Sequence, residues 1–226
     1  MDAKEAAVDS ANTPASNLSK DEKLERLSRS AIEIFSRQGF EGTSLRDIAS
    51  HAGVQLSMID RYFGSKVDLF NEIQRCVWRE INAHRLELLE KPVSVNSDGR
   101  PTLEAVLHAV IYPVVMRAVG DEIQAPMVRL LRENTSMRVH NGLKRGPKRA
   151  LRSEFWAEAL REACPELTPD QVVWSLSFVI STMYTGQLLD GWLDDLMPST
   201  APDSADRITQ MMVQFCDAGI RRIAGT

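Results

Sequence analysis

The stretch that decides the fold, residues 39–66, reads GFEGTSLRDIASHAGVQLSMIDRYFGSK. Apolar side chains recur at helical spacing over residues 44–52 and again over residues 56–63, and Gly53 lies between the two segments. Thr43 is a residue type that caps helix N-termini, and we expect it to cap the first of these helices. Two short helices joined by a tight turn that contains glycine form a helix-turn-helix.

Helices are also predicted on both sides of this motif. Upstream, Ser19 and Glu22 have the spacing of a capping box, and an amphipathic pattern follows them as far as Gly39, the expected C-cap. Downstream, Ser65 and Asp68 have N-terminal capping spacing and predict the start of a long helix. The motif is therefore the second half of a three-helix domain that continues into a longer helix.

The segments GFEGTSLRDIA (39–49), AGV (52–54) and YFGSK (62–66), followed by Leu69 and Phe70, resemble the tetracycline-repressor (TetR) family. The resemblance covers roughly residues 20–75. It implies a sequence-specific DNA-binding transcriptional regulator, most commonly a repressor, that binds double-stranded operator DNA as a homodimer. It also implies that a small-molecule effector binds in the C-terminal part of the chain.

In a helix-turn-helix the second helix enters the major groove, and the first crosses the DNA backbone. Gln55 is suited to an adenine edge, Arg61 to a guanine or a phosphate, and Leu56 to a thymine methyl group. Lys66 and Tyr62 are expected to contact phosphates. The backbone N–H groups at the helix starts near Thr43 and Ser44, and near Ser65 and Lys66, are also suited to a phosphate. The expected DNA-binding residues are Thr43, Ser44, Arg46, Gln55, Leu56, Ser57, Asp60, Arg61, Tyr62 and Lys66.

Structural alternatives exist for several of these residues. Thr43 and Ser65 are also helix caps, and Tyr62 is also suited to packing against the first helix. Asp60 departs from the family pattern, which usually has a polar or aromatic residue there. Phosphates repel a carboxylate unless it accepts from a cytosine amino group or pairs with Arg61. The operator sequence therefore cannot be transferred from the family.

The chain has 226 residues, of which 43% are hydrophobic, enough for a core in each of two domains. No run alternates with period two over a convincing length, so the predicted fold class is all-α, with about nine or ten helices. We expect a disordered leader over 1–18 and a helix-turn-helix domain over 19–81, with the motif at about 44–63. A larger helical effector-binding and dimerisation domain is expected over 82–226.

Composition excludes several classes of protein. The net charge is −4, and residues 20–81 carry 10 Lys/Arg against 10 Asp/Glu, so any DNA contact is local rather than driven by bulk charge. No apolar run of about 18 residues or secretory signal occurs, which predicts a cytoplasmic protein that does not enter membranes. The 3 cysteines lack CxxC spacing and the 4 histidines lack metal-ligand spacing. Without a nucleophile elbow or a phosphate-binding glycine loop, the chain is predicted to be neither an enzyme nor a metal- or cofactor-binding protein.

Two C-terminal helices are expected to form the dimer. Apolar residues surround the axis over 172–192, which predicts burial on all sides, with one side toward a ligand cavity and another toward the partner subunit. The last helix carries one apolar stripe. The resemblance implies that these helices and their symmetry mates form a four-helix interface; packing of the stripe within one chain is the alternative. The expected interface residues are Phe178, Leu189, Met211, Met212, Phe215 and Ile220.

The expected effector is mostly apolar, because its candidate contacts combine apolar surface with a few polar tips. The candidates are His108, Tyr112, Met116, Trp156, Phe178 and Tyr184, for each of which plain core is the alternative. Residues 138–152 carry six Lys/Arg and no acid. This basic run is interpreted as a solvated loop, with an anionic head-group site or an extra DNA contact as alternatives.

The resemblance implies a population shift as the mechanism. The effector would favour a dimer whose recognition helices no longer match half-sites one turn, about 34 Å, apart. The long helix that begins near Lys66 would connect the two domains. The competing function is a ligand-independent DNA-binding protein, which would have a C-terminal domain that is packed solid.

Overall fold

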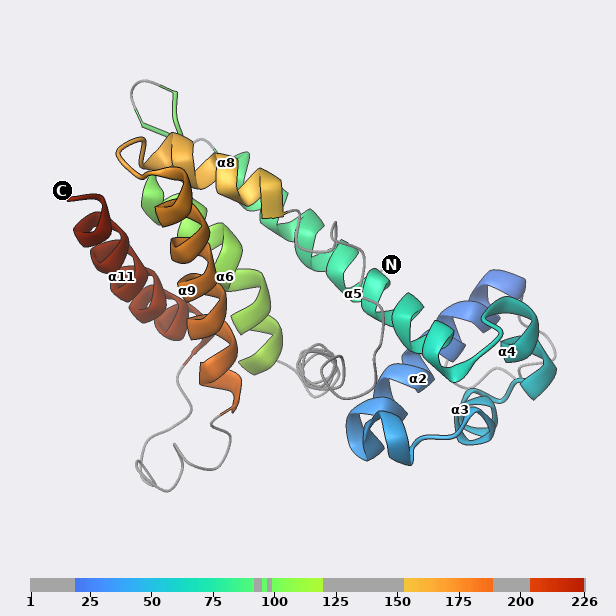
Figure 1. Cartoon of the computed structure of the whole chain (residues 1–226). Coiled ribbons are helices and arrows are strands. Elements are labelled where there is room, and N and C mark those ends of the chain that lie inside the picture. Colours follow the sequence, from blue (N-terminus) through green and yellow to red (C-terminus); the bar gives the residue numbers. More distant parts are fainter. Residues whose placement is uncertain (1–18, 92–94, 97–98, 120–152, 189–203, 226) are drawn as a thin grey trace. The chain divides into compact units, whose positions relative to one another are not determined.

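The computed structural model describes residues 19–91, 95–96, 99–119, 153–188 and 204–225. These residues form helices, one isolated bridge between Val95 and Pro101, and no strand, which confirms the all-α prediction. The helices are α2 (Lys20–Gly42), α3 (Leu45–Ala52), α4 (Leu56–Tyr62), α5 (Lys66–Leu89), α6 (Leu103–Val119), α8 (Ser153–Ala163), α9 (Pro169–Leu188) and α11 (Ala205–Ala224) (Figure 1). The expected leader and the basic run at 138–152 lie outside the described residues.

The chain divides into two compact units, Met1–Arg75 and Cys76–Thr226. The division falls within α5, whose first turns belong to the first unit and whose remainder belongs to the second. None of the described helices is both long enough and apolar enough to cross a membrane.

Caps set the helix boundaries of the first unit. At the start of α2, the Ser19 N–H donates to Glu22 Oε2 at 2.7 Å and the Glu22 N–H donates to Ser19 Oγ at 3.3 Å, which confirms the predicted capping box. Gly39 adopts φ 70°, the left-handed region, and kinks α2 rather than ending it. Gly53, at φ 67°, ends α3 as its C-cap.

The expectation that Thr43 caps α3 is wrong by one residue. The cap is Ser44, whose Oγ accepts from the Asp47 N–H at 3.1 Å. Thr43 is instead buried, with 3% exposure, and its hydroxyl donates to the Gly39 carbonyl at 2.6 Å. The hydroxyl of Thr43 therefore stabilises the turn before α3.

The core of the first unit contains a cluster of three phenylalanine rings. Phe70 on α5 lies edge-on to both Phe35 and Phe40 of α2, with ring centroids 5.0 Å apart in each pair. Ile48 of α3 and Ile59 of α4 are fully buried in the same unit. Each of the two short helices thus contributes an apolar anchor, and the opposite side of each helix is exposed.

Lys66 ties the start of α5 to the turn between α2 and α3. Its ammonium donates to the Phe40 carbonyl at 2.8 Å and to the Thr43 carbonyl at 3.0 Å, and it lies 4.5 Å from the centroid of the Phe40 ring. Hydrogen bonds from a charged donor are stronger than those between neutral groups. This ammonium clamp holds the turn that leads into the helix-turn-helix.

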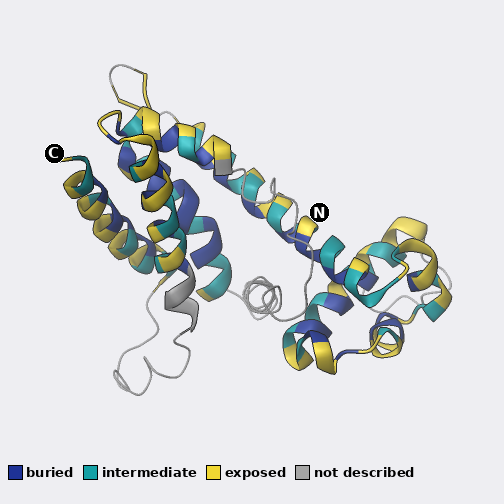
Figure 2. Ribbon diagram, viewed as in Figure 1, coloured by how far each residue is buried: buried dark blue, intermediate teal, exposed yellow. Residues whose placement is uncertain are grey.

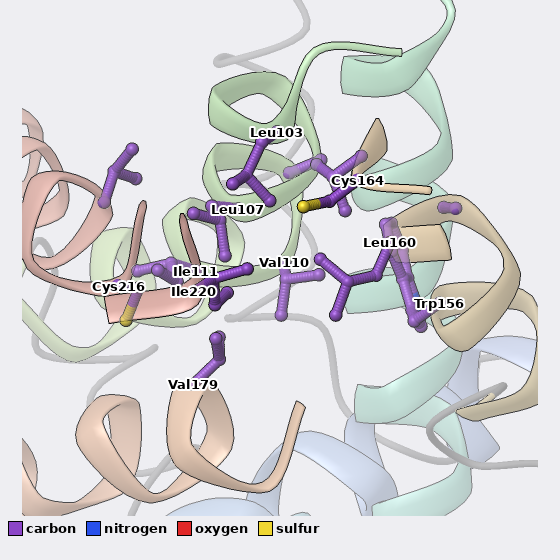
Figure 3. Close-up of a cluster of buried hydrophobic side chains, with 14 of the residues drawn as sticks. Leu103, Leu107, Val110, Ile111, Trp156, Leu160, Cys164, Val179, Cys216 and Ile220 are labelled. Carbon is purple, nitrogen blue, oxygen red and sulfur yellow. The ribbon is translucent and has the colours of Figure 1, made fainter. Parts of the chain in front are cut away.

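The core of the second unit lies around α6. Leu103, Leu107, Val110 and Ile111 of α6 are buried among side chains of α8, α9 and α11, including Leu160 (Figure 3). Figure 2 shows the contrast between this buried helix and the mixed burial of its neighbours. The helix therefore forms the centre of the unit.

Polar contacts fix the helices around that core. At the start of α9, the Thr168 N–H donates to Gln171 Oε1 at 2.8 Å and Pro169 is the first helical residue. Gln171 Nε2 also donates to the Ile223 carbonyl of α11 at 2.9 Å. Arg85 of α5 is 1% exposed, and its Nε and Nη2 donate to the Val110 carbonyl at 3.1 and 2.9 Å.

A single chain buries only one side of helix α9. Val173, Trp174 and Phe178 are exposed at 61%, 61% and 53%, so the expected burial of their side against a partner subunit stays a prediction. The described neighbours α6, α8 and α11 cover the side that carries Val172, Val179 and Met183 and leave the other side open.

We predict that Lys66→Met destabilises the α3 region by about 2 kcal/mol. The carbonyls of Phe40 and Thr43 would lose their charged donor, while methionine keeps most of the aliphatic part of the side chain. Hydrogen exchange measured by mass spectrometry should then be faster for peptides of α3. Lys23→Met on α2 removes an equal charge outside the clamp and serves as the control. Unchanged protection of α3 in Lys66→Met would show that the clamp contributes nothing.

Candidate DNA interface and C-terminal cavities

The exposed side of α4 carries most of the side chains that the sequence predicts to contact bases. Ile59 is fully buried, whereas Ser57, Asp60 and Arg61 are exposed. Gln55 is the N-cap residue, is exposed, and makes no side-chain cap hydrogen bond. Leu56 is half-buried. These polar side chains are therefore available to a ligand that approaches the start of α4.

Tyr62 ends α4 with two cations close to its ring. Lys20 Nζ lies 5.0 Å and Arg61 Cζ 5.9 Å from the ring centroid, and the side chain is 37% exposed. Packing of Tyr62 against Lys20 and contact with a phosphate are compatible, because a partly exposed phenol can do both. Two cations near a partly exposed tyrosine make this end of α4 a favourable place for a phosphate.

The N-terminus of α3 presents Ser44 and Arg46 at the surface. Ser44 Oγ donates to Asp47 Oδ2 at 2.6 Å, so the capping carboxylate lies beside the exposed amides of the first turn. Ser65 and Asp68 repeat the arrangement at α5, with 2.5 Å between Ser65 Oγ and Asp68 Oδ2. A phosphate at either helix start would meet that carboxylate, which weakens the attraction of the helix dipole.

Thr43 is buried and Lys66 is half-buried, which bears on their expected contacts with phosphates. The Thr43 hydroxyl is committed to the Gly39 carbonyl, and two of the three protons of the Lys66 ammonium are committed to the clamp. A phosphate contact from either side chain stays a prediction. The clamp itself was missed, because its acceptors are backbone carbonyls 26 and 23 residues away, which leave no trace in residue spacing.

The candidate effector contacts do not gather in one cavity. His108 stacks on Tyr112 with ring centroids 5.0 Å apart, and it lines a polar cavity of about 700 Å³ together with acids of α6 and α11. Burial lowers the pKa of His108, as does Lys91, against the opposing effect of Asp206 and Glu104. Burial likewise lowers the pKa of His84, whose ring lies edge-on to Tyr112.

The other candidates lie elsewhere. Met116 is half-buried on α6 and lines neither the polar cavity nor the two described next. The side chain of Tyr184 and all of Leu189 lie outside what the structure describes. Trp156 lines a cavity of about 350 Å³, and Phe178 lines a groove of about 860 Å³.

The smaller of these, which we call the Trp156 cavity, lies among α5, α6, α8 and α9. Its wall is mostly apolar and includes the buried residue Arg85. The lining residues are Arg85, Val110, Glu154, Trp156, Ala157, Val173, Leu176, Ser177 and Ile180. The sequence alone could not have placed Arg85 here, because an arginine on an amphipathic helix is usually solvated.

The larger of the two is called the α9–α11 groove. Its lining includes both exposed residues and a core residue, which the sequence had grouped together as interface residues. Met211 and Phe215 are exposed at 46% and 71%, and Met212 is half-buried. Ile220 also lines the groove but is only 3% exposed and belongs to the core of the unit. The side chain of Ile220 is therefore packed mainly against other residues of the same chain.

Comparisons with known proteins agree with this architecture. Residues 27–73 match the family described as bacterial regulatory proteins, tetR family, and residues 150–219 match the tetracyclin repressor-like C-terminal domain. The two matches together cover just over half of the chain. The helix-turn-helix and much of the C-terminal unit are thus matched independently.

Two curated relatives are transcriptional regulators of the helix-turn-helix type. YezE of Bacillus subtilis is 36% identical over 37% of this chain, and the match spans only 43% of that protein. AcrR of Shigella flexneri is 26% identical over 72% of this chain and 74% of its own length.

Solved structures share the fold at low sequence identity. A transcriptional regulator from Pseudomonas aeruginosa PAO1 superposes with a TM-score of 0.62 at 16% identity, over 93% of this chain and 94% of that one. A TetR-like transcriptional regulator from Rhodococcus sp. RHA1 gives a TM-score of 0.59 at 14% identity, over 93% and 100% of the two chains. The chain belongs to the TetR family of transcriptional regulators, which are DNA-binding proteins rather than enzymes.

Proposed function

We propose that this regulator is a homodimeric repressor that leaves its operator when a small, mostly apolar effector binds the C-terminal unit. The observation that carries the proposal is the Trp156 cavity, because a ligand-independent DNA-binding protein would have this unit packed solid. At about 350 Å³ the cavity lies at the lower end of the range for small-molecule sites.

Dimerisation is supported by the apolar side chains that α9 and α11 leave exposed. Trp174 and Phe178 stack with ring centroids 5.9 Å apart, and Met211 and Phe215 are exposed in the α9–α11 groove. A patch of this kind on a soluble chain marks an interaction surface. In an isologous dimer, the exposed side chains of α9 and α11 in one copy would pack against the same helices of the other copy.

Membership of the family implies DNA binding. Which residues of this chain contact the DNA is our proposal. Gln55, Ser57 and Arg61 would read base edges, while Arg46, Tyr62 and the helix starts would hold phosphates. Asp60 lies on the same exposed side and would favour a cytosine amino group over a phosphate.

Gln55→Ala should relax the preference for one operator base pair by about 1–3 kcal/mol, because a bidentate amide contact is lost. The operator is first selected from random duplexes, and affinities for single-base variants are then measured by competition. Arg37→Ala, on the exposed side of α2, is the matched control and should keep the full preference. If Gln55→Ala weakens all operators equally, Gln55 does not read a base.

Phe215→Glu should convert the dimer to a monomer in light scattering, because a charge would be buried in an apolar interface. Gln214→Glu adds the same charge to the neighbouring residue, which lines the polar cavity instead, and should remain dimeric. A dimeric, folded Phe215→Glu protein would remove α11 from the interface.

Effector release can be tested by filling the Trp156 cavity. Ala157→Phe should keep operator affinity while abolishing the response to any compound that both raises the melting temperature of the wild-type protein and dissociates it from DNA. Arg161→Phe, on an exposed position of α8, is the control and should respond as the wild type does. Release that persists in Ala157→Phe would place the effector elsewhere.

A further inference from the structure

We infer that Lys66 serves operator binding as a positioning residue: its ammonium fixes the start of α3 so that Arg46 meets a phosphate, and it does not itself contact the DNA. The inference deepens the proposed function, because it rests on the proposed contact between Arg46 and a phosphate; it does not rest on effector release. The observation that carries it is the position of the Lys66 charge, which lies against two backbone carbonyls and the ring of Phe40.

Helix α2 has no cation of its own where it ends. Its last turn contains no basic residue, although the carbonyls at a helix C-terminus lack intrahelical partners and carry partial negative charge. Lys66, 26 residues after Phe40 in the chain, donates to the Phe40 carbonyl at 2.8 Å and places its positive charge at this helix end. The charge of Lys66 is therefore used within the protein.

The second bond of the ammonium acts on the peptide group that precedes α3. Lys66 Nζ donates to the Thr43 carbonyl at 3.0 Å, and the N–H of that same peptide group belongs to Ser44, the N-cap of α3. A trans peptide group is planar, with its C=O and N–H in opposite directions, so a fixed carbonyl also fixes the Ser44 N–H. This N–H donates to Asp47 Oδ2 at 3.3 Å, and Ser44 Oγ accepts from the Asp47 N–H at 3.1 Å. The ammonium thus sets the orientation of the capping box that begins α3.

Arg46 lies two residues after the cap that the ammonium orients. Arg46 and Ser44 are exposed at the start of α3, whereas Lys66 is half-buried. The Asp47 carboxylate beside this helix start repels a phosphate, so a phosphate contact there depends on a well-placed cation. Arg46 supplies that cation, and Lys66 contributes by fixing the backbone that carries Arg46.

The salt dependence of operator affinity separates positioning from contact. The probe is the duplex that the wild-type protein selects from random sequences, and its affinity is measured at several salt concentrations for Lys66→Met, Arg46→Met and the double variant. Each cation that neutralises a phosphate contributes about 0.9 to the slope of log K against log salt concentration. Adding Lys66→Met to Arg46→Met should leave this slope unchanged. A further decrease of about 0.9 would show that Lys66 contacts a phosphate and would overturn the inference.

The size of the affinity loss distinguishes positioning from general stabilisation. Lys66→Met should weaken binding about tenfold in the wild-type background, as expected from the loss of charged hydrogen bonds. In the Arg46→Met background the loss should be less than about threefold, because the contact that Lys66 positions is already absent. An equal loss in both backgrounds, or an unchanged affinity of Lys66→Met, would overturn the inference. Arg37→Met removes the same charge from an exposed position of α2 and should change neither affinity nor slope.

Two further outcomes keep the hypotheses separate. If circular dichroism shows that Lys66→Met is not folded, Lys66→Gln, which keeps an uncharged N–H donor, replaces it in the same experiment, and the slope alone decides. Wild-type affinity of Arg46→Met would contradict the proposed Arg46 contact and the inference that rests on it, whereas weaker binding of Arg46→Met with an equal Lys66 effect in both backgrounds would contradict the inference alone. None of these measurements contains an effector, so effector release is independent of their result.

Discussion

The second unit depends on one buried cation. Arg85 has 1% exposure, and burial of a guanidinium is costly unless hydrogen bonds compensate for the lost water. Its two donations to the Val110 carbonyl attach α5 to α6, and the rings of Trp78 and Trp156 lie 5.7 and 5.9 Å from the guanidinium carbon. Three helices are thus held around one side chain, and the Trp156 cavity lies beside this junction.

The first unit uses the same kind of interaction on a smaller scale. The ammonium of Lys66 donates to two carbonyls of the turn that precedes α3, just as Arg85 donates to a carbonyl of α6. In both cases the cation donates to backbone carbonyls. Within each unit, therefore, one side chain of α5 ties that helix to a neighbouring segment of the same unit.

Local signals were predictable from sequence, and long-range ones were not. The capping box that begins α2 involves residues three apart, so spacing alone located it. The cap of α3 was misplaced by one residue, because Thr43 and Ser44 are both good capping types and only packing decides which one is buried. The contacts of Lys66 and Arg85 join residues more than 20 positions apart, and a single sequence carries no signal for them.

The candidate pocket residues show a related limit. Apolar side chains with polar tips occur on several faces of α6, α8 and α9, and a sequence does not say which faces meet. The structure assigns His108, Trp156 and Phe178 to three separate cavities. The prediction of a mostly apolar site applies to the Trp156 cavity, whereas the polar cavity at His108 has acids in its wall.

Helix α9 carries two apolar faces, of which a single chain covers one. Val172 and Val179 pack into the core, while Trp174 and Phe178 emerge on the opposite side of the same helix. The sequence shows only that both faces of the helix are apolar. It does not show which face packs within the chain and which face is left exposed. Covering one large apolar side chain is worth about 1.5–3 kcal/mol, so two exposed aromatic side chains on α9 and Phe215 on α11 represent several kcal/mol that one chain cannot gain alone. A second chain that presents the same faces could gain this free energy for both copies, so a helix with two apolar faces is suited to an interface between chains.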